Sequence, residues 1–182
     1  GAVGWLLTSA DPDGGGFVTY HDASGHGLAN QGWKDSSDAI RFHDGTPAQG
    51  PVALCEVQGY AYAAAVGAAD MLERWGGAGR GVGEGGGADD VATLRAYAAR
   101  LQERFREAFW VSVDGRRYPA VALDRDKRAV DSLTSNIGHL LGTGLLTPAE
   151  EAEVAALLVA PDMLSGYGLR TLSASSGGYW PL

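Results

Sequence analysis

The feature that most constrains the fold is a pair of long segments with helical periodicity, separated by a glycine-rich stretch. Between 51 and 76, and again after position 88, apolar side chains recur at spacings of three and four. The apolar positions are Leu54, Val57, Tyr60 or Ala61, Ala64, Ala68, Met71, Leu72 and Trp75 in the first segment, and Val91, Leu94, Tyr97 or Ala98, Leu101, Phe105 and Phe109 in the second. Residues 76–87 are mostly glycine, which is typical of a flexible surface connection. We therefore expect an antiparallel helical hairpin.

Shorter patterns surround this hairpin. The sequence predicts a helix end over 2–9, a short β-like run over 118–123 and a helix over 132–141. A further helix is expected from Thr147 through Val159, with Thr147 as N-cap and proline at the first helical position. The chain lacks strand–helix alternation and a glycine-rich phosphate loop, so a nucleotide-binding α/β fold is not expected. The patterns favour an all-α architecture of helical hairpins joined by long functional loops.

Composition narrows the function classes. The 182 residues are enough for one domain with a core, and their net charge of -8 argues against a nucleic-acid partner. The sequence has no apolar run of membrane-spanning length and no signal-type amino terminus, so we expect no membrane association. Cys55 is the single cysteine and lies in an apolar run, which favours a buried thiol and a reducing, cytoplasmic location.

The most informative motif is GLANQGWKDSSDA at 27–39. It places Asp35 next to a tryptophan, a lysine and two amides. An aromatic face raises the pKa of a neighbouring carboxyl group and stacks on a pyranose ring, and Asn30, Gln31 and Lys34 supply groups that bind sugar hydroxyls. The alternative is that Asp35 caps a helix beginning at SSDAIRF.

Five blocks, taken in order, resemble the amylo-α-1,6-glucosidase, or glycogen-debranching-like, glycoside hydrolases. They are GLANQGWKDSSDA at 27–39, EVQGY at 56–60, SLTSNIGH at 132–139, SGYGLRT at 165–171 and YWPL at 179–182. The resemblance implies an (α/α)6 toroid of helical hairpins, usually behind an amino-terminal β-rich domain. Residues 1–182 are then a fragment of one catalytic domain, about half of the toroid, and their partners are the rest of the toroid and that β-rich domain.

The resemblance also implies the reaction. The expected substrate is an oligosaccharide or small glucoside, most plausibly the α-1,6 branch of a glycogen-like oligosaccharide, cleaved with inversion and without a cofactor. A carboxylic acid protonates the leaving oxygen while a carboxylate activates water. Asp35 is the expected acid, Asp38 is the reserve candidate one helical turn further on, and the base is expected outside this chain. The fragment alone is expected to be inactive. The alternatives are a trehalase, a glucosylglycerate-type glycosidase or a non-catalytic carbohydrate-binding toroid.

The expected substrate-binding set is Asn30, Gln31, Trp33, Lys34, Glu56, Gln58, Tyr60, His139 and Arg170. Trp33 and Tyr60 are expected to frame the sugar. Glu56 has the alternative of a first-turn carboxylate that stabilises the helix dipole. The alternative for His139 is a structural histidine that forms hydrogen bonds within the fold. Arg170 is expected first to brace its glycine-rich loop and second to contact substrate.

A candidate structural calcium site lies near the amino terminus. Asp11, Asp13 and Asp22 occupy the first, third and twelfth places of a calcium-loop-like stretch, with glycine at the sixth place. The fifth place, Gly15, has no side-chain oxygen. The alternative is a glycine-rich turn that leads into FVTY at 17–20.

Overall fold

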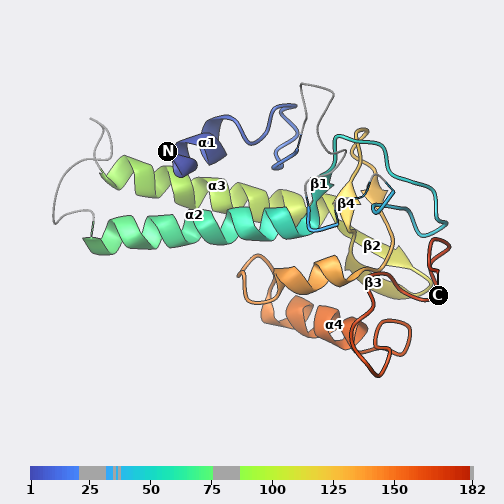
Figure 1. Cartoon of the computed structure of the whole chain (residues 1–182). Helices are drawn as coiled ribbons and strands as arrows, with labels where there is room; N and C mark the ends of the chain where they lie inside the picture. The colour runs from blue at the N-terminus through green and yellow to red at the C-terminus, as the bar shows by residue number, and fades with distance from the viewer. Residues whose placement is uncertain (21–31, 35, 37, 76–86, 181–182) are drawn as a thin grey trace.

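The structure is a computed structural model, and it describes residues 1–20, 32–34, 36, 38–75 and 87–180. Its dominant feature is a long helical hairpin with small strands and a second, shorter helical pair at one end (Figure 1). The elements are α1 (Ala2–Thr8), β1 (Ala53–Leu54), α2 (Cys55–Trp75), α3 (Gly87–Ala108), β2 (Trp110–Val113), β3 (Arg116–Pro119), β4 (Ala122–Leu123), β5 (Ala129–Val130), the 3-10 helix η1 (Ser135–Leu140) and α4 (Pro148–Leu158).

The predicted hairpin is confirmed, but the buried face of its first helix is not the predicted one. Ala65 and Ala69 of α2 pack against Leu94 and Ala98 of α3. On α2 the expected Ala64 is exposed, and Met71 and Trp75 are exposed as well. Small alanine side chains let the two backbones approach closely, so the alanine row forms the contact although longer apolar side chains lie nearby. On α3 the predicted positions Leu94 to Phe105 are buried as expected.

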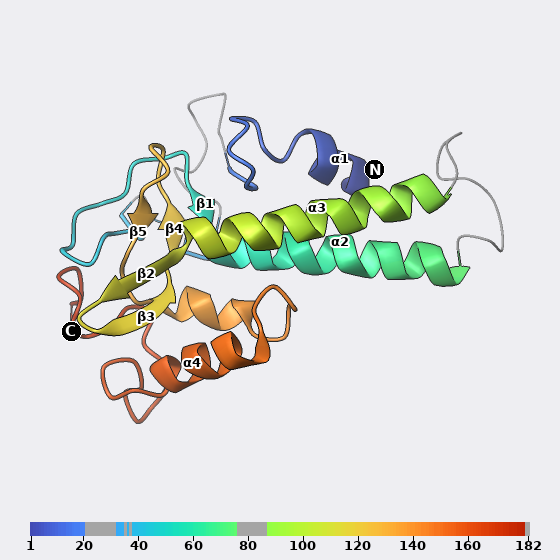
Figure 2. The ribbon, with the colours of Figure 1, turned by 180° about the vertical axis from the view of Figure 1, so that it is seen from behind.

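The all-α expectation requires correction because the described residues contain five short strands. β1, β4 and β5 form an antiparallel sheet in the order β1-β4-β5, and β2 pairs with β3. Asp114 and Gly115 join β2 to β3, and both have positive φ. An Asp-Gly pair is a typical two-residue hairpin turn, so the sequence contained this signal. The strands gather at the end of the hairpin where α3 finishes (Figure 2).

The second helical pair supports α2 from one side. α4 begins as predicted, because Thr147 and Glu150 form a reciprocal capping box. The helix expected over 132–141 is instead the shorter η1, a 3-10 helix. Gly59 of α2 permits this packing, since a Cβ there would lie 3.0 Å from the Leu140 side chain.

One hydrophobic core joins these parts. It lies where α3, the β2–β3 hairpin, η1 and α4 meet, and its largest fully buried side chains include Tyr118, Phe105 and Phe109. Cys55 is completely buried in the same core, as expected. The core therefore lies at the end of the molecule where α2 begins. A side chain in the first turn of α2 has a rigid base.

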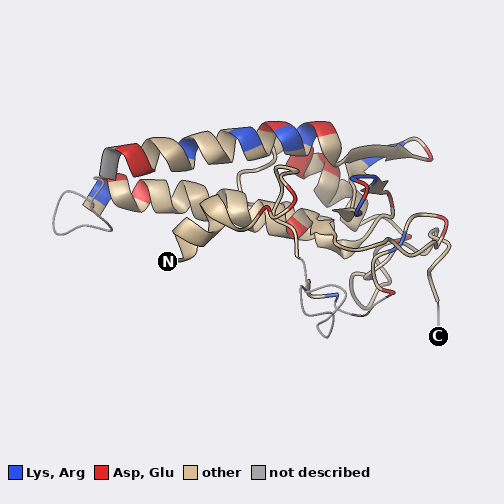
Figure 3. Ribbon diagram, turned by 90° about the horizontal axis from the view of Figure 1, so that it is seen from above, with Lys and Arg blue, Asp and Glu red and all other residues tan. Residues whose placement is uncertain are grey.

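The surface carries both charge signs. Acidic and basic side chains are interspersed along α3 (Figure 3). Within the described residues, no helix has the length and apolarity needed to cross a bilayer.

Candidate functional site

The candidate site forms around the first turn of α2. β1 leads directly into the helix, and this places Glu56 in the first turn with its side chain almost completely buried. Asn136 of η1 donates from Nδ2 to Glu56 Oε1 at 2.8 Å, and the Cys55 thiol contacts Oε2 at 3.5 Å. Burial raises the pKa of the Glu56 carboxyl group, while the hydrogen bond from Asn136 works in the opposite direction.

Lys34, from the motif at 27–39, lies close enough to Glu56 for the charge of that carboxyl group to act on it. Its Nζ donates to the carbonyl oxygen of Thr171. Burial lowers the pKa of Lys34 to about 8, although the negative charge of Glu56 opposes this shift. Lys34 thus connects Trp33 and its neighbours to the 165–171 loop, far away in sequence, within the electrostatic reach of Glu56.

The aromatic rings of Trp33, Tyr60 and His139 lie close to one another beside these polar groups. The Tyr60 hydroxyl lies 2.6 Å from His139 Nδ1. The His139 ring centroid is 6.1 Å from that of Tyr60 and 6.1 Å from that of Trp33, while Lys34 Nζ lies 5.1 Å from the Trp33 ring centroid. Trp33 and Tyr60 are each 49% exposed, so both present accessible ring surface. Exposed aromatic faces beside hydrogen-bonding groups suit the alternating apolar and hydroxyl surfaces of a sugar.

The structure therefore brings together five of the predicted side chains. They are Trp33, Lys34, Glu56, Tyr60 and His139. Asn30, Gln31 and Asp35 lie outside the described residues. Asp35 follows Lys34 directly in sequence, and its role as the acid stays a prediction.

Gln58 does not belong to the substrate-binding residues, contrary to the prediction. Its side chain is completely buried, its oxygen accepts from the Val18 amide, and its nitrogen donates to the carbonyls of Val18 and Leu54. The two bonds to Val18 hold the segment around that residue against α2, and the third binds the end of β1. The prediction of a sugar contact is corrected because no polar atom of this amide faces solvent.

Arg170 and Asp38 also have other partners. Arg170 donates to the Tyr179 hydroxyl and to the Pro161 carbonyl, both at 3.2 Å, which is the bracing role expected first. Asp38 forms an exposed ion pair with Arg41 at 2.8 Å. Residues 38–42 are not helical, so the helical-turn spacing expected for Asp38 and the cap alternative for Asp35 lose their basis there.

The calcium-loop prediction is only partly described. Asp11 Oδ2 accepts from the Gly16 amide at 2.7 Å and Asp13 Oδ1 accepts from the Gly15 amide at 3.1 Å, so both carboxylates hold the glycine-rich turn. Lys127 places its ammonium group 2.5 Å from Asp13 Oδ2. Asp22 lies outside the described residues, and calcium binding stays a prediction.

Residues 134–136 contribute to the surroundings of Glu56 in a way that no sequence signal indicated. Besides the Asn136 bond to Glu56, side-chain oxygens of Thr134, Ser135 and Asn136 are buried without a hydrogen-bond partner in the described part of the chain. The block SLTSNIGH contained these residues, but only its histidine was selected. Of these three residues, Asn136 is the one that reaches the buried carboxyl group of Glu56.

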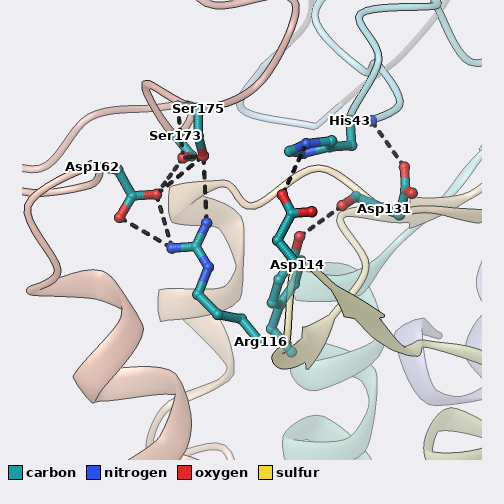
Figure 4. A network of polar contacts seen from close by, with 8 residues as sticks. His43, Asp114, Arg116, Asp131, Asp162, Ser173 and Ser175 are labelled. Atoms are coloured by element: carbon teal, nitrogen blue, oxygen red, sulfur yellow. Dashed lines mark hydrogen bonds and ion pairs between the residues drawn. The ribbon is translucent and has the colours of Figure 1, made fainter.

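A second polar network holds the loop that carries Thr171. Arg116 of β3 donates to both carboxylate oxygens of Asp162, at 3.1 and 2.9 Å, and Ser173 donates to Asp162 as well (Figure 4). Ser175 contacts Arg116 at 3.4 Å. The hydrogen bonds and the Arg116 charge hold the pKa of Asp162 below its usual value despite partial burial. This network anchors both ends of the 162–175 segment to Arg116 of the β2–β3 hairpin.

The same close-up shows a contact between the hairpin turn and the 38–47 region. His43 Nε2 lies 3.6 Å from Asp114 Oδ2, and the His43 amide donates to Asp131 Oδ1 at 2.9 Å (Figure 4). Asp114 of the turn and Asp131 therefore both contact the segment that follows the motif.

Comparison with known proteins identifies a similar fold. No protein-family model and no curated protein sequence matches the chain. Among solved structures, neutral trehalase from Saccharomyces cerevisiae matches with a TM-score of 0.55 and 16% sequence identity. The match covers 80% of this chain and 26% of the trehalase chain, so this chain spans about a quarter of that protein's length. At this identity the likeness is one of fold alone.

Proposed function

We propose that this chain is part of a glycoside hydrolase that cleaves an α-linked glucoside with inversion. The observation that carries the proposal is that the rings of Trp33, Tyr60 and His139 lie close together. Lys34 lies beside Trp33, within the electrostatic reach of Glu56. These side chains come from three of the five sequence blocks. The fold likeness to a trehalase supports the same class of enzyme.

In this proposal the roles are divided by accessibility. The exposed rings of Trp33 and Tyr60 pack against the sugar, and Lys34 and His139 bind its hydroxyl groups. Glu56 is too deeply buried for a large contact with the sugar and acts mainly on the charge of Lys34. This modifies the expected direct role of Glu56.

Asp35 is the proposed general acid, next in sequence to the Trp33–Lys34 pair. It donates its proton to the glycosidic oxygen as the bond to the anomeric carbon breaks. A base carboxylate, proposed to lie outside this chain, takes a proton from the water that attacks the opposite face. Asp38 is the weaker candidate because Arg41 neutralises its charge on the surface.

The substrate is proposed to be the α-1,6 branch of a glycogen-like oligosaccharide, on the strength of the five sequence blocks. The fold likeness favours trehalose as the second candidate. The two linkages place different groups beyond the glucose ring, so the distinction depends on the leaving-group side of the pocket.

The test measures glucose release by the full-length protein from a branched limit dextrin, trehalose and maltose. Asp35→Asn is expected to lower kcat by at least about a hundredfold, which is the usual contribution of a general acid. Asp38→Asn is the matched control and is expected to keep near-normal activity. Initial release of β-glucose identifies inversion.

The outcomes separate the candidates. Release from trehalose alone would replace the debranching assignment by trehalase. Loss of activity in Asp38→Asn with retention in Asp35→Asn would assign the role of general acid to Asp38 and not to Asp35. Binding of these sugars without any release would favour a non-catalytic carbohydrate-binding toroid.

A further inference from the structure

A separate pocket of about 340 Å³ lies between α1, the 10–18 segment and α3. Its walls include Leu6 of α1, Asp11 and Gly16 of the glycine-rich turn, and Arg100 and Arg104 of α3. It shares no residue with the aromatic site around Glu56. The volume lies at the lower end of the roughly 300–1,000 Å³ usual for small-molecule sites.

The two arginines differ from the other basic side chains. Throughout the described part of the chain, each lysine or arginine side chain makes a hydrogen bond or an ion pair, except Arg74, Arg100 and Arg104. Two of these three line one pocket. In a chain of net charge -8, arginines without a carboxylate partner are a local positive site against an acidic background.

Helix geometry directs both arginines to the same place. Arg100 and Arg104 are four positions apart on α3, so their Cβ atoms lie about 5–6 Å from each other on one face. Arg104 packs directly on Gly16, where a Cβ would come within 1.7 Å of Nη1. The absence of a side chain at Gly16 therefore allows the guanidinium group to lie against the turn.

A hydrogen bond to Asp11 stabilises the glycine-rich turn. Asp11 Oδ2 accepts the Gly16 amide at 2.7 Å, which commits one carboxylate oxygen to the backbone. The charged lining thus has two guanidinium groups against one carboxylate. Tyr97 lies in the same wall, and burial raises the pKa of its phenol, so its hydroxyl stays available as a neutral donor.

We propose that this pocket binds a small phosphorylated ligand, with the phosphate group held by Arg100 and Arg104. A carboxylate ligand is satisfied by a single guanidinium fork. A phosphate group has enough oxygens to accept from two forks and a phenol at once, so it matches this donor set better. The apolar wall formed by Leu101 and Phe17 leaves contact area for an organic group attached to the phosphate.

Calorimetric titration of the full-length protein tests the proposal, with glucose 6-phosphate, inorganic phosphate and glucose as separate probes. Arg100→Gln and Arg104→Gln are each expected to weaken binding of glucose 6-phosphate about tenfold or more, because each removes a charge-assisted contact. Arg74→Gln is the matched control: it removes an equally unpaired arginine on α2 and is expected to bind normally. Arg104→Lys keeps the charge without the fork and is expected to fall between wild type and Arg104→Gln.

The probes distinguish the possible sources of the phosphate group. Tighter binding of glucose 6-phosphate than of inorganic phosphate supports a phosphorylated organic ligand, whereas equal binding supports free phosphate in the same site. Absence of binding by both phosphate probes overturns the proposal, as does equal loss in Arg74→Gln or unchanged affinity in the Arg100→Gln/Arg104→Gln variant. Melting curves confirm that the variants are folded. The glucosidase assay is independent of this result because the two sites share no residue.

Discussion

Asn136 Nδ2 lies 2.8 Å from Glu56 Oε1, and this hydrogen bond connects η1 to the first turn of α2 across 80 positions of sequence. Both side chains are buried. A buried carboxyl group requires a donor because desolvation disfavours its charged form. The bond therefore holds the Glu56 carboxyl group in place, where its charge acts on Lys34.

Removing this donor is expected to destabilise the protein. Asn136→Ala leaves Glu56 Oε1 without its donor, and we expect a loss of about 1–3 kcal/mol in the free energy of unfolding. The lower half of that range is favoured because the mutation also removes an unpaired buried oxygen of Asn136. Urea denaturation measures the change. Ser135→Ala is the control, since its hydroxyl has no partner, and an equal loss there would contradict the explanation.

Lys34 is expected to titrate well below the usual range of a lysine. The chain has only two lysines, so reductive ¹³C-methylation gives two lysine signals, and Lys34→Arg identifies the one from Lys34. That signal is expected to titrate with a pKa of about 8. A value near 10.5 would show that Lys34 is not buried beside Glu56.

The same shift predicts the pH dependence of stability. Between pH 8 and 10.5 the unfolded chain binds more protons at Lys34 than the folded chain does, so this residue makes stability rise with pH. Wild type is therefore expected to gain stability relative to Lys34→Met over that range, measured by urea denaturation at each pH. A constant difference between the two proteins would contradict burial of the ammonium group.

Glu56→Gln isolates the charge of the buried carboxyl group. Glutamine keeps an oxygen that accepts from Asn136, but it removes the negative charge that supports protonation of Lys34. The pKa of Lys34 is therefore expected to fall below about 8 in this variant. Glu73→Gln, far along α2, is the control and is expected to leave the titration unchanged.

Glu56 also has a stability signature at acidic pH. Its pKa is raised in the folded state, so the folded chain binds more protons just above pH 4.5 and stability falls as pH rises through the folded pKa. The Glu56→Gln variant is expected to lack this decline. An identical pH profile in both proteins would place Glu56 in contact with water.

Gln58 is expected to be important for stability. Gln58→Leu removes three hydrogen bonds and leaves backbone groups of Val18 and Leu54 without their partner. At roughly 1 kcal/mol for each bond, we expect a loss of about 2–4 kcal/mol. Gln102→Leu, which removes two bonds from a more exposed position, is expected to cost less. Unchanged stability with weakened sugar binding in Gln58→Leu would restore its predicted role as a substrate ligand.

Arg116 is expected to control the motion of the loop that carries Thr171. Arg116→Met removes both bonds to Asp162, and amide exchange over 162–175 is expected to accelerate roughly tenfold, which corresponds to about 1.4 kcal/mol. Arg117→Met is the neighbouring control, because Arg117 pairs with Glu153 and stacks on Trp110. Faster exchange in both variants would indicate general loosening of the hairpin.

The hairpin and α4 could be predicted because their signals are local. Apolar spacing identified α2 and α3, and the Thr147 cap with the following proline identified the start of α4. The prediction of which row of α2 is buried was wrong, because alanine and longer apolar side chains both fit the periodic pattern. Only contact with Leu94 and Ala98 selects Ala65 and Ala69.

The site was predicted as a set of residue types, not as an arrangement. The motif at 27–39 supplied Trp33 and Lys34, and the other blocks supplied Glu56, Tyr60 and His139. The sequence could not show that Gln58 bonds to the backbone of Val18. Glu56 and Gln58 are both polar residues in the first turn of α2, and the sequence does not say which way each side chain points. Asn136 was missed because an amide has no distinctive signal until its partner is known.

The amino-acid sequence by itself determined the two long helices α2 and α3, the start of α4, and which residue types are available for the proposed sugar site, since these depend on local periodicity, capping and composition. The tertiary structure decided which of those residues meet. Burial of Glu56, the depressed pKa of Lys34 and the contact between Tyr60 and His139 all arise from segments distant in sequence. Desolvation and hydrogen bonding between such segments exist only after the chain has folded.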